Sequence, residues 1–402
     1  MKIFSFTFAN GDLSRLELMA VLEKLGTSFK VKSCEKNFCC VELDRLPAEI
    51  TKILGGSFKI GEVVVESSDE QTFLGELENS KVFDWLDEKP LWGLSLYGIS
   101  NDLSTEFVED VQVLLAEKIR GAGGRKAKRV LPDMIDAGEG LKELSSGLVA
   151  EKNVIDSQLV RFKDSYVLAK TISAIQSNEF HQRDMERPVQ NPLISLPPRV
   201  ARILVNLTGL IGGETLLDPF CGIGTILMEA VAMGINVIGL DRGASRVKGT
   251  RQNLNWFRER NPMAKKVSFS VWHGDARELD RIVHKSIDGI ATEPILLPPL
   301  ERFLTQEEAQ TLLLPAFNIY RQSLKSMEAI LKSGGKIAIV VPYIRLSDRK
   351  KAGFDIALLL DGTGLKVVDV EGFTFPLLAR FTPDQKVIRG VLLLEKPRTF
   401  VL

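Results

Sequence analysis

The stretch from residue 215 to residue 229, TLLDPFCGIGTILME, constrains the fold more than any other part of the chain. Its apolar start, which ends on Asp218, is typical of a strand buried in a parallel sheet. A glycine turn from Gly222 to Gly224 follows, and the residues from Thr225 onward have apolar side chains at helical spacing. A strand, a glycine turn and a helix in this order predict the start of a βαβ unit, whose turn and helix amino terminus leave room and free N–H groups for a ligand.

Strand and helix patterns alternate through the rest of the carboxyl-terminal half. This alternation predicts an α/β fold with a doubly wound, Rossmann-like sheet. After a helix at 200–210 and the strand and helix described above, the expected strands lie at 237–241, 267–272, 287–292, 336–341, 366–370 and 387–395, and the expected helices at 244–258, 307–332 and 354–360.

The amino-terminal half mixes strand and helix patterns without regular alternation. The expected strands are 2–8, 38–43, 62–67, 91–99, 158–161 and 165–169, and the expected helices are 13–25, 72–86, 105–119 and 144–154. A break at Lys89-Pro90 divides this half into two α+β domains. The predicted domains are therefore 1–88 and 89–174, followed by a linker at 175–192 and the α/β domain at 193–402.

The composition is that of an ordinary globular protein, with 45% hydrophobic and 26% charged residues and a net charge of zero. The start of the chain alternates like a strand rather than a signal peptide, and no apolar run approaches the roughly 18 residues of a membrane span. We therefore expect a cytoplasmic protein without membrane association. The four cysteines contain no C-x-x-C pair and there are three histidines, so neither disulfides nor a metal site is predicted.

A basic segment interrupts this neutral chain at KIRGAGGRKAKRVL. A run of charge is usually a solvated face. Here glycines lie between the cations, which predicts a flexible loop that contacts phosphate groups. The cations are Lys118, Arg120, Arg125, Lys126, Lys128 and Arg129.

Asp241 ends the strand that follows the glycine turn and its helix. A carboxylate about 20 residues after such a turn can accept hydrogen bonds from both ribose hydroxyls of a nucleoside cofactor. An isolated aspartate at this place would simply be a turn residue, so the glycine turn is what supports the ribose interpretation.

Three motifs give the chain a family resemblance. DPFCGIGT resembles the first motif of S-adenosylmethionine-dependent methyltransferases that act on exocyclic amines of nucleic-acid bases. Residues 180–188, FHQRDMERP, resemble the segment that joins a THUMP domain to the methyltransferase domain in tRNA guanosine N2-methyltransferases. The strand with Ser95 to Gly98 and the Leu144-Ser145-Ser146 helix resemble that family's THUMP domain. From residue 91 onward the resemblance covers most of the chain, and for residues 1–90 it implies a ferredoxin-like unit by position alone.

The resemblance implies S-adenosylmethionine as cofactor and tRNA as partner, with a small activating subunit as a further partner that some relatives require. The THUMP domain would grip the RNA by shape and phosphate contacts. The reaction would add a methyl group to the N2 amine of a guanosine, with position 10 as the expected target. The implied cofactor-binding residues are Asp218, Phe220, Gly222, Gly224, Thr225, Asp241, Asp275 and Ala276.

The implied catalytic residues are Glu293 and Pro294, which follow the strand at 287–292. A side-chain oxygen and a backbone carbonyl would accept the two protons of the guanine amine and position its nitrogen for methyl transfer. Relatives carry Asp or Asn, then Pro-Pro, then an aromatic residue that stacks on the flipped base. This chain has the longer Glu293, with Ile295 and Leu296 in place of the second proline and the aromatic residue, so stacking falls to Phe220 or to those two aliphatic side chains.

Arg187 and Arg389 complete the expected substrate contacts, with a phosphate or the target base as the group bound. For both residues an ordinary salt bridge is the alternative. The altered motif at Glu293 leaves open two other functions: a non-catalytic RNA-binding protein with a degenerate methyltransferase fold, and a methyltransferase for another nucleobase amine in ribosomal RNA or DNA.

Overall fold

The computed structural model describes residues 1–48, 50–98, 103–131, 144–152, 154–175, 177–190, 196–379, 382 and 384–398. The chain divides into two compact units, and each is described by itself. The first consists of Met1–Arg15, Leu22–Lys52 and Ser57–Glu179, and the second of Leu16–Val21, Ile53–Gly56 and Phe180–Leu402. Among the described residues, no helix combines the length and the apolar character that crossing a membrane requires.

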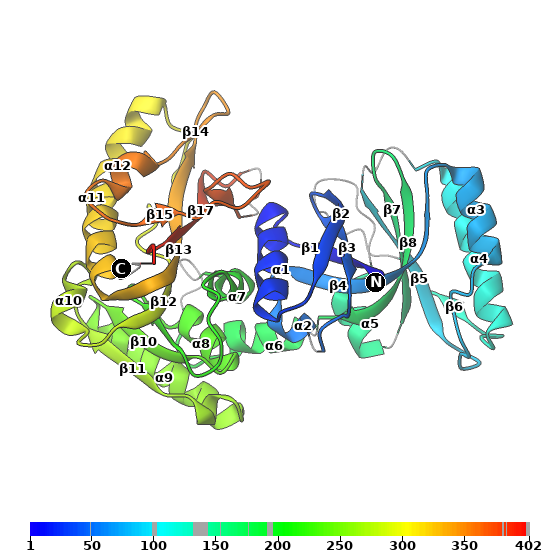
Figure 1. Ribbon diagram of the computed structural model, residues 1–402, viewed down its shortest axis with the longest axis horizontal. Coiled ribbons are helices and arrows are strands. Elements are labelled where there is room, and N and C mark those ends of the chain that lie inside the picture. Colours follow the sequence, from blue (N-terminus) through cyan, green and yellow to red (C-terminus); the bar gives the residue numbers. More distant parts are fainter. Residues whose placement is uncertain are drawn as a thin grey trace. The chain divides into compact units, whose positions relative to one another are not determined.

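The elements of the amino-terminal half can be followed in Figure 1 from blue to green. The strands are β1 (Lys2–Phe8), β2 (Phe29–Glu35), β3 (Phe38–Leu43), β4 (Ser57–Ser67), β5 (Leu91–Gly98), β6 (Lys128–Arg129), β7 (Ile155–Arg161) and β8 (Tyr166–Ala174). The helices are α1 (Asp12–Lys24), α2 (Ile50–Ile53), α3 (Glu70–Asn79), α4 (Thr105–Gly121), α5 (Ser146–Lys152) and α6 (Ser177–His181).

One continuous sheet runs through the first unit. The described strands follow the order β2-β3-β1-β4-β8-β7-β5-β6, and β4 pairs with β8 along the whole length of β8, from Lys59 opposite Ala174 to Ser67 opposite Tyr166. The strands of residues 1–88 and those of residues 89–174 therefore belong to one hydrogen-bonded sheet. A division of this unit into two domains stays a prediction.

A buried polar network links strands β4, β5 and β7. Lys59 on β4 is fully buried, and its Nζ donates to Asp156 Oδ2 at 2.9 Å, Ser95 Oγ at 2.9 Å and the Leu144 carbonyl at 3.0 Å. Ser95 Oγ also accepts from the Leu144 N–H at 3.0 Å. Ser95 and Leu144 belong to the two sequence motifs of this half, so these motifs meet at a buried charge whose hydrogen bonds are satisfied.

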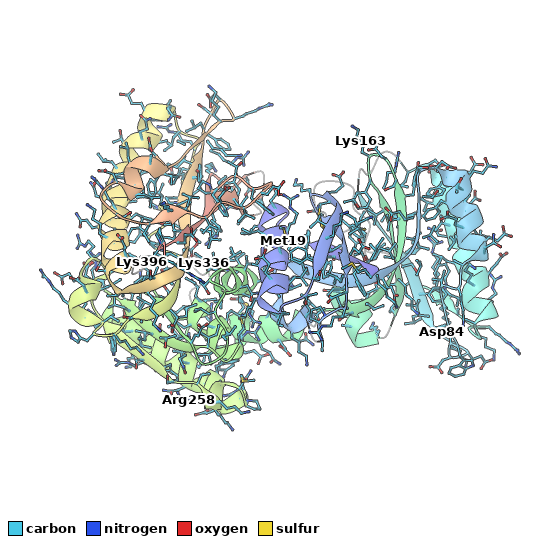
Figure 2. All side chains as sticks on the ribbon, viewed as in Figure 1. Met19, Asp84, Lys163, Arg258, Lys336 and Lys396 are labelled. Carbon is cyan, nitrogen blue, oxygen red and sulfur yellow. A yellow bond between two sulfur atoms is a disulfide. The ribbon has the colours of Figure 1, made fainter. Side chains whose placement is uncertain are left out.

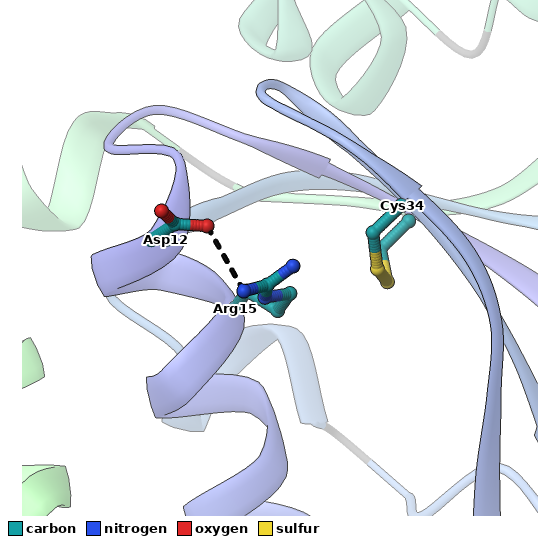
Figure 3. The surroundings of a disulfide bond; sticks show 4 residues. Asp12, Arg15 and Cys34 are labelled. Atoms are coloured by element: carbon teal, nitrogen blue, oxygen red, sulfur yellow. Dashed lines mark ion pairs between the residues drawn. A yellow bond between two sulfur atoms is a disulfide. The ribbon is translucent and has the colours of Figure 1, made fainter. Parts of the chain in front are cut away.

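The prediction that the chain has no disulfide is wrong, because Cys34 and Cys39 are bonded (Figure 3). The two residues lie opposite each other where β2 pairs with β3 in an antiparallel hairpin. Strand β2 was not expected from the sequence, and without it the pairing could not be anticipated.

Figure 3 also shows the ion pair between Asp12 and Arg15 on α1, with an Oδ1–Nη2 distance of 3.1 Å. Cys40 and Cys221 are free and buried, and free cysteine commonly packs as a small hydrophobic side chain.

The second half of the chain has the elements of the expected α/β fold (Figure 1). The strands are β9 (Thr215–Asp218), β10 (Asn236–Asp241), β11 (Phe269–His273), β12 (Ile287–Thr292), β13 (Leu331–Arg345), β14 (Lys351–Ala352), β15 (Lys366–Val367), β16 (Leu377–Leu378) and β17 (Val387–Glu395). The helices are α7 (Pro198–Leu207), α8 (Thr225–Ala232), α9 (Ala244–Arg260), α10 (Leu279–Ile282), α11 (Gln306–Ile330) and α12 (Ile356–Leu360). A π-helical turn at Gln182–Glu186 and short 3-10 turns at Ala264–Lys266 and Ala276–Glu278 complete the set.

The sheet of the second unit follows the order β11-β10-β9-β12-β13-β17-β15 within the described residues. The strands from β11 to β13 pair in parallel, whereas β17 is antiparallel to β13 and β15. Figure 2 labels Lys336 on β13 and Lys396 just after β17, and these lie at one end of the β13–β17 pair, where Lys336 is opposite Glu395. The strand order reverses between β9 and β12, so ligands are expected beyond the carboxyl ends of these two strands.

Candidate functional site

The glycine turn after β9 is fastened to α9. Gly222 has φ +54° and Gly224 has φ +91°, both in the left-handed region that favours glycine. Thr250 Oγ1 on α9 donates to the Gly222 carbonyl at 2.7 Å, and Asn253 Nδ2 donates to the Ile223 carbonyl at 2.9 Å. The turn therefore keeps a fixed shape, and α8 begins directly after it.

Asp241 at the end of β10 closes the other side of this turn. Its Oδ2 accepts the Gly222 N–H at 3.0 Å, and its Oδ1 accepts the Gly243 N–H at 2.7 Å. The carboxylate is buried, with an exposed fraction of 6%. The Asp241 carboxylate thus joins two loops. Each of its oxygens retains a second lone pair that can accept a hydrogen bond from a ligand hydroxyl.

Asp275 follows β11 and is engaged by a neighbouring arginine. Arg277 Nε and Nη2 donate to its two oxygens at 2.9 and 2.6 Å, and the Arg277 N–H donates to Oδ1 at 3.0 Å. These hydrogen bonds lower the pKa of Asp275 to about 2. The carboxylate is thus ionised at neutral pH, but a ligand amine there would share it with Arg277.

Asp218 lies at the end of β9 and is buried, with an exposed fraction of 2%. Its Oδ1 accepts from Thr292 Oγ1 at 2.7 Å and from the Phe220 N–H at 3.1 Å. Burial raises the pKa of Asp218 to about 7, and the nearby charges of Asp241 and Glu293 act in the same direction. Its protonation state is therefore sensitive to pH near neutrality.

Glu293 follows β12 directly and forms an ion pair with Arg389 on β17. The Arg389 Nε donates to Glu293 Oε1 at 2.5 Å. Burial raises the pKa of the Glu293 carboxyl group, and the charge and hydrogen bond of Arg389 lower it. The ion-pair alternative for Arg389 is therefore present, and its partner is the predicted catalytic carboxylate.

These groups line one cavity of about 590 Å³ beyond the carboxyl ends of β9, β10, β11 and β12. Both predicted catalytic residues line it, and so do all the predicted cofactor-binding residues except Gly224, which caps α8 behind the turn. Ile295, Leu296 and Phe220 also line it, so the two aliphatic replacements and the remaining aromatic side chain lie at the same cavity. No cluster of three or more potential metal ligands occurs in the described parts of the chain.

The segment before α7 and α7 itself contact α8 through buried charges. Arg183 Nε and Arg202 Nε donate to the two oxygens of the fully buried Glu229 at 2.5 and 2.9 Å. Arg187 is also buried, with an exposed fraction of 2%, and its Nη1 donates to Thr225 Oγ1 at 2.7 Å. We expected Arg187 to contact a phosphate or the target base, but the structure places it inside the protein, where it holds the first turn of α8.

The basic segment is more ordered than expected. Lys118 and Arg120 belong to α4, and Lys128 and Arg129 form β6, which pairs with β5. The Lys118 Nζ donates to the carbonyls of Glu78 and Ser80, so that side chain is half-buried and engaged. The other five cations are exposed, which fits a surface for phosphate groups. These residues belong to the first unit, and the residues that line the cavity belong to the second.

Several residues of the site were not anticipated from the sequence. Thr292 and Arg277 hold the carboxylates of Asp218 and Asp275, and Arg246, Leu196 and Ile319 line the cavity. Arg277 could have been found two residues after Asp275, at the start of a helical turn. The contact between Arg389 and Glu293 had no local signal, because 96 positions separate the two residues.

Most residues of the site lie in a stretch that is similar to known methyltransferase domains. Residues 186–348 match the family model described as RMKL-like, methyltransferase domain. The chain is 34% identical over 185 residues to the tRNA (guanine(10)-N2)-dimethyltransferase of Methanothermobacter thermautotrophicus, a match that covers 46% of this chain and 49% of the relative. It is 26% identical over 319 residues to the enzyme of the same name from Pyrococcus abyssi, covering 76% of this chain and 85% of the relative.

The fold is also that of a solved methyltransferase structure. TrmN from Thermus thermophilus superposes with a TM-score of 0.54 at 17% identity, over 98% of this chain and 99% of that one. The match to the Methanothermobacter relative spans about half of that protein's length. Residues 186–348 are therefore similar to the methyltransferase domains of the RMKL-like family.

Proposed function

We propose that this protein is an S-adenosylmethionine-dependent tRNA methyltransferase that modifies the N2 amine of a guanosine, with position 10 as the expected target. The relatives from Methanothermobacter and Pyrococcus bear the name of this activity, which supports the substrate. The exposed cations between Arg120 and Arg129 support an RNA partner, because phosphate binding requires local positive charge.

One observation carries the proposal. The carboxylate and proline that follow β12 line the same cavity as the glycine turn after β9 and the carboxylate that ends β10. A methyl donor held by the turn and an amine held at Glu293 would thus meet in a single cavity. Catalysis of this kind depends mainly on holding the two reactants in line.

The residues present fit the proposed cofactor. A Cβ added to Gly222 would meet no atom within 4 Å, so the turn leaves open space beside its backbone. Asp241 would accept the ribose hydroxyls, Asp275 and Ala276 would border the adenine, and Asp218 would lie near the positively charged end. When bound, S-adenosylmethionine supplies a methyl group on a positively charged sulfur, and its transfer to an amine releases one amine proton.

The residues of this chain would prepare the guanine amine for that transfer. Glu293 and the Pro294 carbonyl would accept the two amine protons, which turns the nitrogen lone pair away from the ring. Glu293 would then hold the released proton. Phe220, Ile295 and Leu296 would cover the base and exclude water from the reacting groups.

The experiment is methyl incorporation into an unmodified tRNA transcript, followed by nucleoside analysis, for the wild type and for Glu293→Gln. We expect N2-methylguanosine from the wild type and a rate on the order of 100-fold lower from Glu293→Gln. Binding of S-adenosylmethionine, measured by calorimetry, should change little in the variant. A different methylated nucleoside would overturn the proposed substrate, and a fully active variant would overturn the role of Glu293.

A further inference from the structure

Glu293, the predicted acceptor carboxylate of the cavity, is bound by a residue from a strand that is not adjacent to β12. Glu293 follows β12, and Arg389 lies on β17, with β13 between the two strands. The last β12 residue, Thr292, is opposite Ile339 of β13, and Arg389 is opposite Pro342 three positions further along. The arginine side chain therefore reaches back across β13 to contact Glu293.

The contact uses one of the two carboxylate oxygens. Arg389 Nε donates to Oε1 at 2.5 Å, and no other described residue hydrogen-bonds to either oxygen of the Glu293 side chain. Because Glu293 lines the cavity, Oε2 is the oxygen that a ligand donor can use. The side chains of Glu293 and Arg389 are only 11% and 20% exposed, so water competes weakly for this pair.

The charges around Glu293 make this cation important. Asp218 at the end of β9 is acidic, and the repulsion between it and the Glu293 carboxylate raises the pKa of Asp218. Burial also disfavours a charge on Glu293, whereas Tyr320 on α11 is a neutral buried phenol whose hydroxyl donates to the Val340 carbonyl at 3.0 Å. Arg389 is the group that acts in the opposite direction among the described residues.

We propose that Arg389 is a positioning residue for the methyl-transfer reaction, which fixes Glu293 Oε1 so that the ionised Oε2 faces the substrate amine. This inference rests on the proposed function. It explains how a glutamate can act where relatives have a shorter side chain. The extra methylene adds a rotatable bond. An ion pair through Oε1 alone restricts rotation about that bond before the substrate binds and leaves Oε2 available. The expected substrate contact of Arg389 is thereby replaced by a contact with Glu293.

The test compares Arg389→Met, Arg389→Lys and the control Arg302→Met. Arg302 forms a similar but exposed ion pair with Glu308, at an Nη2–Oε1 distance of 2.6 Å. Single-turnover methyl transfer is measured from pH 5.5 to 9 with saturating tRNA and S-adenosylmethionine. The affinity for tRNA is measured separately by filter binding, and the fold of each variant is checked by thermal unfolding.

For Arg389→Met we expect a single-turnover rate lower by about 10-fold or more at pH 7.5, with a tRNA affinity within about threefold of the wild type. The rate falls at acid pH when Glu293 is protonated. Without Arg389 the pKa of Glu293 rises, so this fall moves to higher pH. Titration of Asp218 also affects the acid side, but it is common to all the variants. Arg389→Lys should restore part of the rate, and Arg302→Met should behave as the wild type.

Two results would overturn the inference while the proposed function stands. One is a loss of tRNA affinity with an unchanged saturated rate, which would make Arg389 a substrate-binding residue. The other is a lower rate with an unmoved pH profile and no rescue by lysine, which would make its role merely structural. A wild type that transfers no methyl group to tRNA would overturn the proposed function and this inference together.

Discussion

Asp218 combines nearly complete burial with a position at the cavity. A carboxyl group whose pKa rises on folding stabilises the folded state at low pH, and this stabilisation is lost as the pH rises through the folded-state pKa. For Asp218 that pKa is about 7, well above the ordinary value of 3.8. The ionised form is therefore costly near neutral pH, and a positively charged ligand would offset the cost.

The first prediction concerns this carboxyl group. In Asp218→Asn the buried charge is absent. The free energy of unfolding of the variant, relative to that of the wild type, should therefore rise by about 3 kcal/mol when the pH is raised from 5 to 8. The measurement is the free energy of unfolding by urea at both pH values. A difference between the two proteins that does not change with pH would contradict the raised pKa.

Two glycines of the turn provide a matched pair of substitutions. Gly222 and Gly224 both have positive φ, but only at Gly224 would an added Cβ meet a close neighbour, Thr250 Cγ2 at 2.9 Å. We predict that Gly222→Ala costs about 1 kcal/mol of stability and Gly224→Ala about 2–3 kcal/mol. Urea unfolding measures both values. Equal losses would mean that the close approach to Thr250 costs nothing.

At the scale of elements, the sequence predicted β1, β3, β12 and β17 with the bounds that the structure has. Their burial patterns are nearly continuous, so the apolar signal was clear. Strand β2 was missed because three of its residues, Lys30 to Lys32, are exposed at the edge of the sheet. The helix expected at 72–86 ends at Asn79, because Ser80 closes it with a backbone hydrogen bond to Leu77.

The site was predicted unevenly for a similar physical reason. Residues that belong to short local patterns, such as the glycine turn and the carboxylates at strand ends, were found and do line one cavity. Their partners from distant segments were not found, because spacing along the chain carries no signal for an ion pair such as Glu293–Arg389. The burial of Arg187 was not anticipated, because an arginine beside acidic residues resembles a surface residue in sequence.

The docking of the linker segment on α8 gives a prediction at this scale. Glu229 is fully buried between Arg183 and Arg202, and removal of its charge would leave two buried cations without their partner. We expect Glu229→Gln to lower the free energy of unfolding by about 3–5 kcal/mol. The control Glu259→Gln, which alters an exposed pair with Arg260, should change it by less than about 1 kcal/mol. Similar effects of both substitutions would contradict the structural role of Glu229.

At the scale of the whole molecule, the chain combines a unit with a basic surface and a unit with the cavity. Each unit has its own sheet within the described residues. The cations of the first unit and the cavity of the second can therefore be altered separately. Binding of RNA and transfer of a methyl group should respond to different substitutions.

The basic surface gives a prediction for RNA affinity. Arg125 and Lys128 are exposed, so their replacement by alanine should weaken tRNA binding and reduce the slope of log affinity against log salt by about 1–2. S-adenosylmethionine affinity should stay the same, because the cavity residues lie in the other unit. The control is a double replacement of Lys30 and Lys32 on β2. An unchanged salt slope for Arg125→Ala, Lys128→Ala would remove these residues from the RNA interface.

The central claim is that this cavity transfers a methyl group to the N2 amine of one guanosine. The most direct measurement uses two tRNA transcripts that differ at position 10, one with guanosine and one with inosine, which lacks only that amine. The account predicts methyl incorporation and N2-methylguanosine in the first transcript, and no incorporation at position 10 in the second. Equal incorporation into both transcripts would contradict it.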